Sequence, residues 1–85
     1  MITHTARPKN YYQGLLAIIE KAIERENDAE NYYEKCAKIV GDPKLKAFLT
    51  ELGQNEIQHR VVLEQYLCEL EAQLEIDEEM ENALK

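Results

Sequence analysis

The sequence predicts an all-α fold: an antiparallel two-helix hairpin plus a short C-terminal helix, dimerising into a four-helix bundle. Two long segments carry apolar residues at alternating steps of four and three, which line one face of an α-helix. A Gly-Asp-Pro turn separates these segments, and only three Gly and two Pro occur in the 85 residues. A composition rich in Ala, Glu, Lys and Leu also favours long helices.

The first helix is predicted to begin near Tyr11, with Asn10 as its N-cap, and to end near residue 40. The positions on its apolar face are Leu15, Ile19, Ala22, Glu26, Ala29, Tyr33, Cys36 and Val40. Residues 1–9 show no helical period, so we expect a flexible N-terminal arm there.

The segment Gly41-Asp42-Pro43 is predicted to end the first helix and to begin the second. Gly41 suits the left-handed position after a helix, Asp42 the N-cap, and Pro43 the first helical position. The apolar face of the second helix is Leu45, Leu49, Leu52, Glu56, His59, Leu63, Tyr66 and Leu70. A turn this short makes the two helices antiparallel neighbours.

The second helix is expected to break near residue 76, where Asp77 can cap a short third helix that carries Met80 and Leu84. The alternative is one continuous helix to the C-terminus. The predicted parts are the arm 1–9, the helical hairpin 10–75 and the acidic C-terminal helix or tail 76–85. Residues 69–85 hold seven acids against one base, which makes either a solvated face or a surface that concentrates cations.

Charge and hydropathy exclude several classes of partner. The net charge of −7 argues against nucleic acid and against an anionic membrane surface. No apolar run is long enough to cross a bilayer.

Cys36 lies close to Gly41, whereas Cys68 lies far beyond it along the second helix, so a straight hairpin excludes a disulfide between them. We therefore expect a cytoplasmic protein with reduced thiols.

Three residues of metal-ligand type interrupt the two apolar faces. Glu26 and Glu56 lie equally far along the chain from Gly41, one before it and one after it. At a rise of about 1.5 Å per residue both are about 22 Å from the turn, so they are expected at one level of the hairpin. His59 follows Glu56 by about one helical turn. Because an unpaired buried carboxylate is costly, these groups must be paired, neutralised or bound to a metal.

The ligand types point to a di-iron centre shared between two chains. Such four-helix bundles take a Glu from each of two helices and a Glu-x-x-His from each of the other two, and this chain supplies one of each. A homodimer would complete the set, with Glu56 as bridging carboxylate, Glu26 as terminal carboxylate and His59 as nitrogen ligand. Tyr33, one heptad after Glu26, can hydrogen-bond a ligand or take part in electron transfer, with a core residue as the alternative. Glu30 is a candidate for an outer cation site, with a solvated face as the alternative.

These motifs resemble the encapsulated ferritins, half-length members of the ferritin-like superfamily. The resemblance covers roughly residues 15–70 and rests on four features. They are the pair Tyr32-Tyr33 after Glu26, Asp42-Pro43-x-Leu45-x-x-x-Leu49, Glu56-x-x-His59, and the spacing between Glu26 and Glu56.

The resemblance implies a ferroxidase, which oxidises Fe(II) to Fe(III) with O₂ at a di-iron site on the two-fold axis of a dimer. It also implies a decamer built from dimers, and iron storage in the cytoplasm inside an encapsulin nanocompartment.

Three departures from that family stand in the sequence. Tyr32 occupies a position that is often Trp in the family, and Arg25 stands where an outer-site acid is expected, which leaves Asp28 as the candidate. The sequence as given ends at Asn82-Ala83-Leu84-Lys85, without the Leu/Gly/Ser-type peptide that docks such cargo in its shell.

Two other functions fit the same residues. One is a rubrerythrin-like di-iron peroxidase, although such proteins usually carry a four-cysteine module and both halves of the bundle on one chain. The other is a non-enzymatic helical-hairpin oligomerisation module, in which Glu26 and His59 form a buried pair that sets the helix register.

Overall fold

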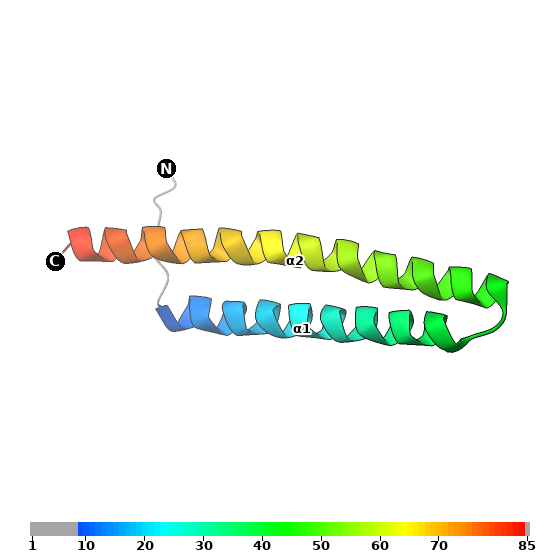
Figure 1. Cartoon of the computed structure of the whole chain (residues 1–85). Coiled ribbons are helices and arrows are strands. Elements are labelled where there is room, and N and C mark those ends of the chain that lie inside the picture. Colours follow the sequence, from blue (N-terminus) through cyan, green and yellow to red (C-terminus); the bar gives the residue numbers. More distant parts are fainter. Residues whose placement is uncertain (1–8, 85) are drawn as a thin grey trace.

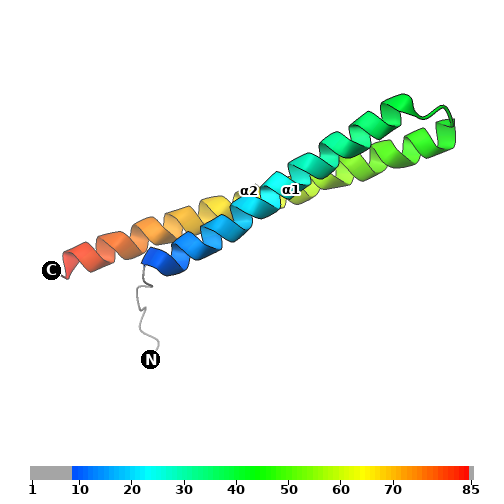
Figure 2. The ribbon, with the colours of Figure 1, turned by 90° about the horizontal axis from the view of Figure 1, so that it is seen from below.

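The computed structural model describes residues 9–84, which form an antiparallel hairpin of two long α-helices (Figure 1). Helix α1 spans Lys9–Ile39 and helix α2 spans Pro43–Ala83. The hairpin is a rod with principal-axis extents of 65 × 24 × 14 Å. The two helices cross at a shallow angle, as the view in Figure 2 shows. The predicted all-α hairpin is confirmed, and neither described helix is both long and apolar enough to span a membrane.

Helix α1 begins at Lys9, two residues earlier than its apolar pattern predicts. Asn10 therefore lies inside the helix, and its assignment as N-cap is wrong. A nucleated helix gains one backbone hydrogen bond for each added residue, so it can extend beyond its first apolar position. The remainder of the predicted arm, residues 1–8, lies outside the described residues.

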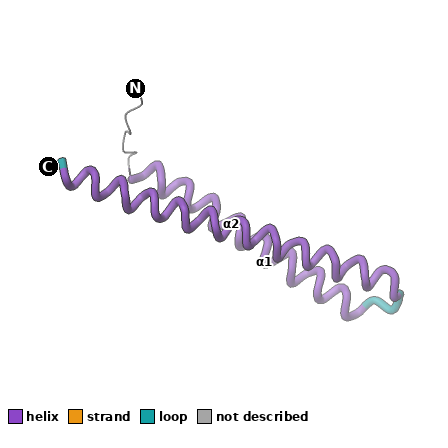
Figure 3. The backbone as a smooth tube through the Cα atoms, turned by 90° about the horizontal axis from the view of Figure 1, so that it is seen from above, coloured by secondary structure: helices purple, strands orange, loops and turns teal. Residues whose placement is uncertain are grey.

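The turn between the helices is short and is the one non-helical stretch between residues 9 and 83 (Figure 3). Asp42 is extended, with φ −76° and ψ 117°, and its carboxylate accepts hydrogen bonds from the backbone N–H groups of Lys44 and Leu45, each at 3.3 Å. Its assignment as N-cap, with Pro43 in the first turn of α2, is confirmed. Gly41 has no positive φ, so its predicted left-handed conformation is wrong. Instead, the Val40 N–H donates to the Cys36 carbonyl at 3.2 Å and closes α1 without a left-handed residue.

Helix α2 continues without interruption through Ala83, so the predicted break and the separate third helix are wrong, and the alternative of one continuous helix is confirmed. No Gly or Pro follows Gly53 in the sequence, so no residue with poor helix propensity ends α2 earlier. Asp77 does not cap a helix. Its side chain is buried, 2% exposed, and accepts hydrogen bonds from the Tyr12 hydroxyl at 2.5 Å and from the Gln73 amide at 3.0 Å.

The contact between the helices is centred beside the predicted apolar face of α2, not on it. All eight positions of the first face are partly buried, but Leu45, His59 and Tyr66 of the second face are exposed. Helix α2 instead turns Gly53 and Arg60 toward α1. A Cβ atom built on Gly53 would lie 3.6 Å from Tyr33 Cβ, so the backbones approach closely there.

A single chain buries little apolar surface. Among the described residues, Tyr12 and Ala37 are the buried hydrophobic ones. The exposed large side chains include Ile18 and Tyr32 on α1 and Phe48, Val62 and Tyr66 on α2. At about 100° per residue, the three on α2 lie on the same side of the helix as His59. We call Phe48, Val62 and Tyr66 the exposed flank.

Candidate metal centre

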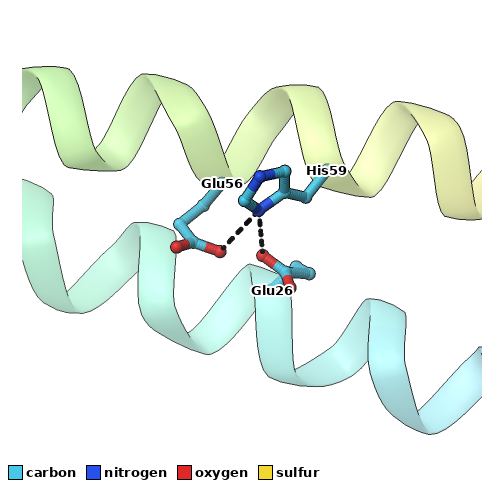
Figure 4. A group of neighbouring side chains, drawn as sticks. All are labelled: Glu26, Glu56 and His59. Atoms are coloured by element: carbon cyan, nitrogen blue, oxygen red, sulfur yellow. Dashed lines mark ion pairs between the residues drawn. The ribbon is translucent and has the colours of Figure 1, made fainter.

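Glu26, Glu56 and His59 meet near the middle of the hairpin (Figure 4). Glu26 comes from α1, and the other two come from adjacent turns of α2. One ligand atom from each residue lies within 4.8 Å of the others. Among residues 9–84, this is the one group of three or more His, Cys, Asp or Glu side chains with such a spacing. The predicted convergence of the three residues is therefore present in the fold.

The imidazole lies between the two carboxylates. His59 Nδ1 is 3.6 Å from Glu26 Oε2 and 3.6 Å from Glu56 Oε2, longer than a normal hydrogen bond. The Glu26 and Glu56 side chains are largely buried, 24% and 19% exposed, whereas that of His59 is 62% exposed. The centre is thus closed on the carboxylate side and open on the His59 side, toward the exposed flank.

One carboxylate oxygen of this group is buried without a compensating hydrogen bond. Glu26 Oε2 is buried and has no hydrogen-bond partner among the described residues. The nearby His59 nitrogen forms an ion pair with it only when the imidazole is protonated. A buried polar atom without a partner is costly, and an ion is one of the explanations for such an atom. A bound cation fits this position.

The donor set also fits iron. Carboxylates are hard oxygen donors that can bridge two ions, and imidazole nitrogen binds iron well. Glu26, Glu56 and His59 would hold the metal, and they amount to half of the six-residue set of a di-iron bundle.

An ion pair that the sequence analysis missed lies beside the centre. The Arg60 guanidinium donates to the Glu30 carboxylate and, at 2.5 Å, to Asn27 Oδ1, so it joins α2 to α1. The sequence spacing places both residues beside the centre, because Arg60 follows Glu56 by four residues and Glu30 follows Glu26 by four. Glu30 and Arg60 therefore each lie one helical turn along their own helix from a residue of the centre. Glu30 is therefore engaged by a cationic side chain, and Asp28 is exposed. Neither belongs to the three-residue group, and an outer cation site stays a prediction.

Tyr33 is partly buried one heptad after Glu26. Its ring packs edge-on against Tyr32 at 5.7 Å, and its Cβ faces Gly53. Its role at the centre stays a prediction.

The Tyr32 side chain is hydrogen-bonded to Cys36, which raises the pKa of Tyr32 above its ordinary value of 10.0. Cys36 and Cys68 are both free thiols, as the hairpin geometry predicts.

Comparison with known protein families adds an independent observation. The rubrerythrin family matches residues 17–85, which include Glu26, Glu56 and His59. No match was found among curated proteins or among solved structures. Rubrerythrins are di-iron proteins of the ferritin-like superfamily, and the Glu26, Glu56 and His59 donors agree with that cofactor. The chain therefore belongs to the rubrerythrin family.

Proposed function

We propose that this protein is a ferroxidase, which oxidises Fe(II) to Fe(III) with O₂ at a di-iron site formed across a homodimer interface. The observation that carries the proposal is the convergence of Glu26, Glu56 and His59 around a buried carboxylate oxygen without a hydrogen-bond partner among the described residues. Membership in a di-iron family supports a redox enzyme.

Each of the three residues has a distinct task in binding. In this proposal Glu56, the more buried carboxylate, would bridge two ions, and Glu26 would hold one of them. Neutral His59 supplies a nitrogen donor. As substrate, two Fe(II) ions lose one electron each, and one O₂ takes up both electrons and two protons to give H₂O₂. The protein positions the two cations together and offsets their mutual repulsion with carboxylate charge.

A second copy of the chain supplies the missing half of the centre in this proposal. The di-iron set needs six ligand residues, and one chain brings three. The open His59 side coincides with the exposed flank, so one apolar contact would cover both. A two-fold axis through the metal pair satisfies this, because a C2 interface is self-complementary. By the resemblance given above, the dimers would assemble into a decamer that feeds iron to an encapsulin compartment.

The charge of the chain favours a cationic substrate. The net charge is −7, and seven acids lie between residues 69 and 81. A field of this sign raises the local concentration of Fe(II) and speeds its arrival.

A rubrerythrin-like peroxidase is the second candidate, and the family match is the observation that favours it. The same pair of Fe(II) ions would supply two electrons to H₂O₂, which takes up two protons and leaves as two waters. The two functions differ in the oxidant that the iron pair prefers.

The test is anaerobic loading with Fe(II), followed by O₂ in one sample and H₂O₂ in another, with Fe(III) formation measured by absorbance. Wild type is compared with Glu56→Ala and His59→Ala, and with Glu51→Ala, which removes an exposed acid of the same helix. A ferroxidase oxidises about two irons per dimer rapidly with O₂, only while Glu56 and His59 are present.

Oxidation by H₂O₂ that exceeds the buffer rate by more than oxidation by O₂ does, and that is lost in Glu56→Ala and His59→Ala, would instead establish the peroxidase. Oxidation at the buffer rate with both oxidants would reject both enzymes and leave a helical-hairpin oligomerisation module.

A further inference from the structure

A second polar contact crosses the hairpin at its open end. The Tyr12 hydroxyl donates to Asp77 Oδ2 at 2.5 Å, and the Gln73 amide donates to Asp77 Oδ1 at 3.0 Å. Tyr12 is 4% exposed and Asp77 2% exposed, which makes them more buried than Glu26 or Glu56. Among the described residues, this contact is the most enclosed polar interaction that joins the two helices.

Tyr12 and Asp77 are in register with the metal ligands. Tyr12 precedes Glu26 by two heptads, and Asp77 follows Glu56 by three heptads. Because both intervals are whole heptads, all four side chains occupy the same seam between α1 and α2. Any rotation or slide of one helix that separates Tyr12 from Asp77 also changes how Glu26 faces Glu56.

Without a metal, no hydrogen bond between Glu26, Glu56 and His59 holds the two carboxylates opposed. Glu26 and Glu56 are like charges when ionised, and Glu26 Oε2 has no hydrogen-bond partner among the described residues. The apolar side chains of the seam attract one another without directional preference. Contacts outside the three residues must therefore keep the two carboxylates opposed before metal arrives. One is the Arg60–Glu30 ion pair beside the centre, and another is the Tyr12–Asp77 contact at the open end.

The centre lies midway between two fixed points. Gly41 of the turn and Tyr12 lie almost equally far from Glu26 along the chain, in opposite directions. Each interval corresponds to about 21–22 Å of helix. The turn fixes one end of the hairpin covalently, and the Tyr12–Asp77 contact fixes the other end by hydrogen bonds.

A buried carboxylate is an expensive way to join two helices. Apolar residues of similar size at such positions often give equal or greater stability, and register control is the best-attested reason to keep a polar contact.

We propose that Tyr12 and Asp77 are positioning residues, which hold α1 and α2 in the arrangement that receives metal at Glu26, Glu56 and His59. The inference rests on the metal centre of the proposed function but not on its oxidation chemistry.

The test measures Co(II) affinity, since Co(II) probes the ligands without the reaction of Fe(II) with O₂. The variants are Tyr12→Phe, Asp77→Ala, the double variant and Asp77→Asn, with Tyr11→Phe as control. Tyr11 is adjacent and 45% exposed, so its variant also loses one tyrosine hydroxyl. Titrations are made at a temperature where circular dichroism shows every variant folded, and assembly mass is recorded in parallel.

We expect Tyr12→Phe and Asp77→Ala each to weaken Co(II) binding about tenfold, within the range found for residues that influence a site without contacting its ligand. The double variant should match the single ones, because both remove the same contact. Asp77→Asn keeps an oxygen that accepts from the Tyr12 hydroxyl and should stay within about twofold of wild type. The Co(II) absorption spectrum at saturation should be unchanged, because the ligands are unchanged.

Wild-type Co(II) affinity in Tyr12→Phe, with only the melting temperature lowered, would overturn the inference and assign the contact to stability alone. A changed spectrum at saturation would also overturn it, since a positioning residue does not alter the ligand set. Tight Co(II) binding without Fe(II) oxidation in wild type would reject the ferroxidase but not this inference. Absence of Co(II) binding by wild type would reject both.

Discussion

His59 Nδ1 lies 3.6 Å from Glu26 Oε2, although the two residues belong to different helices and are far apart in the sequence. Glu56 Oε2 lies at the same distance from that nitrogen. Both distances are too long for a normal hydrogen bond, so His59 satisfies neither carboxylate oxygen in this way. The two carboxylates and the imidazole are thus brought together without hydrogen-bonding one another, and their donor types suit a metal.

Replacing Glu26 by Leu is expected to stabilise the metal-free protein by about 1–3 kcal/mol, because it removes a buried carboxylate oxygen without a partner among the described residues. The same variant should lose all stabilisation by added metal. Urea unfolding with and without Co(II) measures both effects. Glu24→Leu is the control, since Glu24 is exposed on the same helix. A large loss of stability in metal-free Glu26→Leu would contradict the interpretation.

Gly53→Ala is expected to stabilise the protein by up to about 1 kcal/mol, because alanine has the better helix propensity. The added Cβ would meet Tyr33 Cβ at 3.6 Å, an ordinary van der Waals contact. Gly14→Ala, where the new Cβ meets nothing within 4 Å, serves as the reference for propensity alone. Thermal unfolding of both variants provides the measurement.

A larger residue at the same position has the opposite effect. Gly53→Leu is expected to push α2 from α1 and to weaken Co(II) binding, as shown by a titration. Unchanged metal affinity in Gly53→Leu would mean that the close approach at Gly53 does not position the centre.

Removal of the Arg60 side-chain charge leaves Glu30 largely buried without its cationic partner. Arg60→Met is therefore expected to cost about 1–3 kcal/mol in the free energy of unfolding. The double variant Arg60→Met/Glu30→Gln should recover most of that loss, because no unpaired charge remains. Urea denaturation of the four proteins of this cycle gives the interaction energy. Additive losses would show that the two side chains do not act as a pair.

Asp42→Ala is expected to cost about 1 kcal/mol, because two backbone N–H groups at the start of α2 lose their acceptor. Asp42→Asn should retain most of that stability, since its amide oxygen can cap in the same way. Thermal unfolding measures both variants. Equal losses in the two would indicate that charge at the helix N-terminus matters more than the hydrogen bonds.

Val62→Glu is expected to prevent dimer formation and to weaken metal binding, although Val62 is not a ligand. It places a charge on the exposed flank, which the proposed dimer covers. Val61→Glu is the matched control, because about 100° of helix rotation moves that neighbour, which is also exposed, away from His59. Sedimentation analysis with and without Co(II) provides the measurement. Equal effects in the two variants would argue against the flank as the interface.

The position of the metal centre along the hairpin can be predicted from the sequence, because it depends only on helix geometry and on where the turn lies. The rise per residue and the helical period are the same in every α-helix, and Asp42 and Pro43 mark the turn. Equal intervals from Gly41 therefore bring Glu26 opposite Glu56 without any knowledge of packing. The free thiols of Cys36 and Cys68 follow from the same arithmetic.

The rotation of α2 about its axis was decided only by the tertiary structure. This rotation depends on how all side chains between the two helices pack together. A pattern of apolar residues specifies only a broad stripe along the helix and not which residues of that stripe face the partner helix. The close approach at Gly53 turns Arg60 toward α1 and leaves His59 on the open side.

The role of Asp77 depends on a similar long-range choice. The neighbouring sequence alone makes Asp77 a candidate helix cap. In the structure its carboxylate instead accepts a buried hydrogen bond from Tyr12, which is distant in the chain. The sequence by itself determined the two helices, the turn between them and the level at which Glu26, Glu56 and His59 meet, because these depend on local geometry. The tertiary structure decided which side of α2 faces α1 and which residue partners Asp77, because those depend on contacts between distant residues.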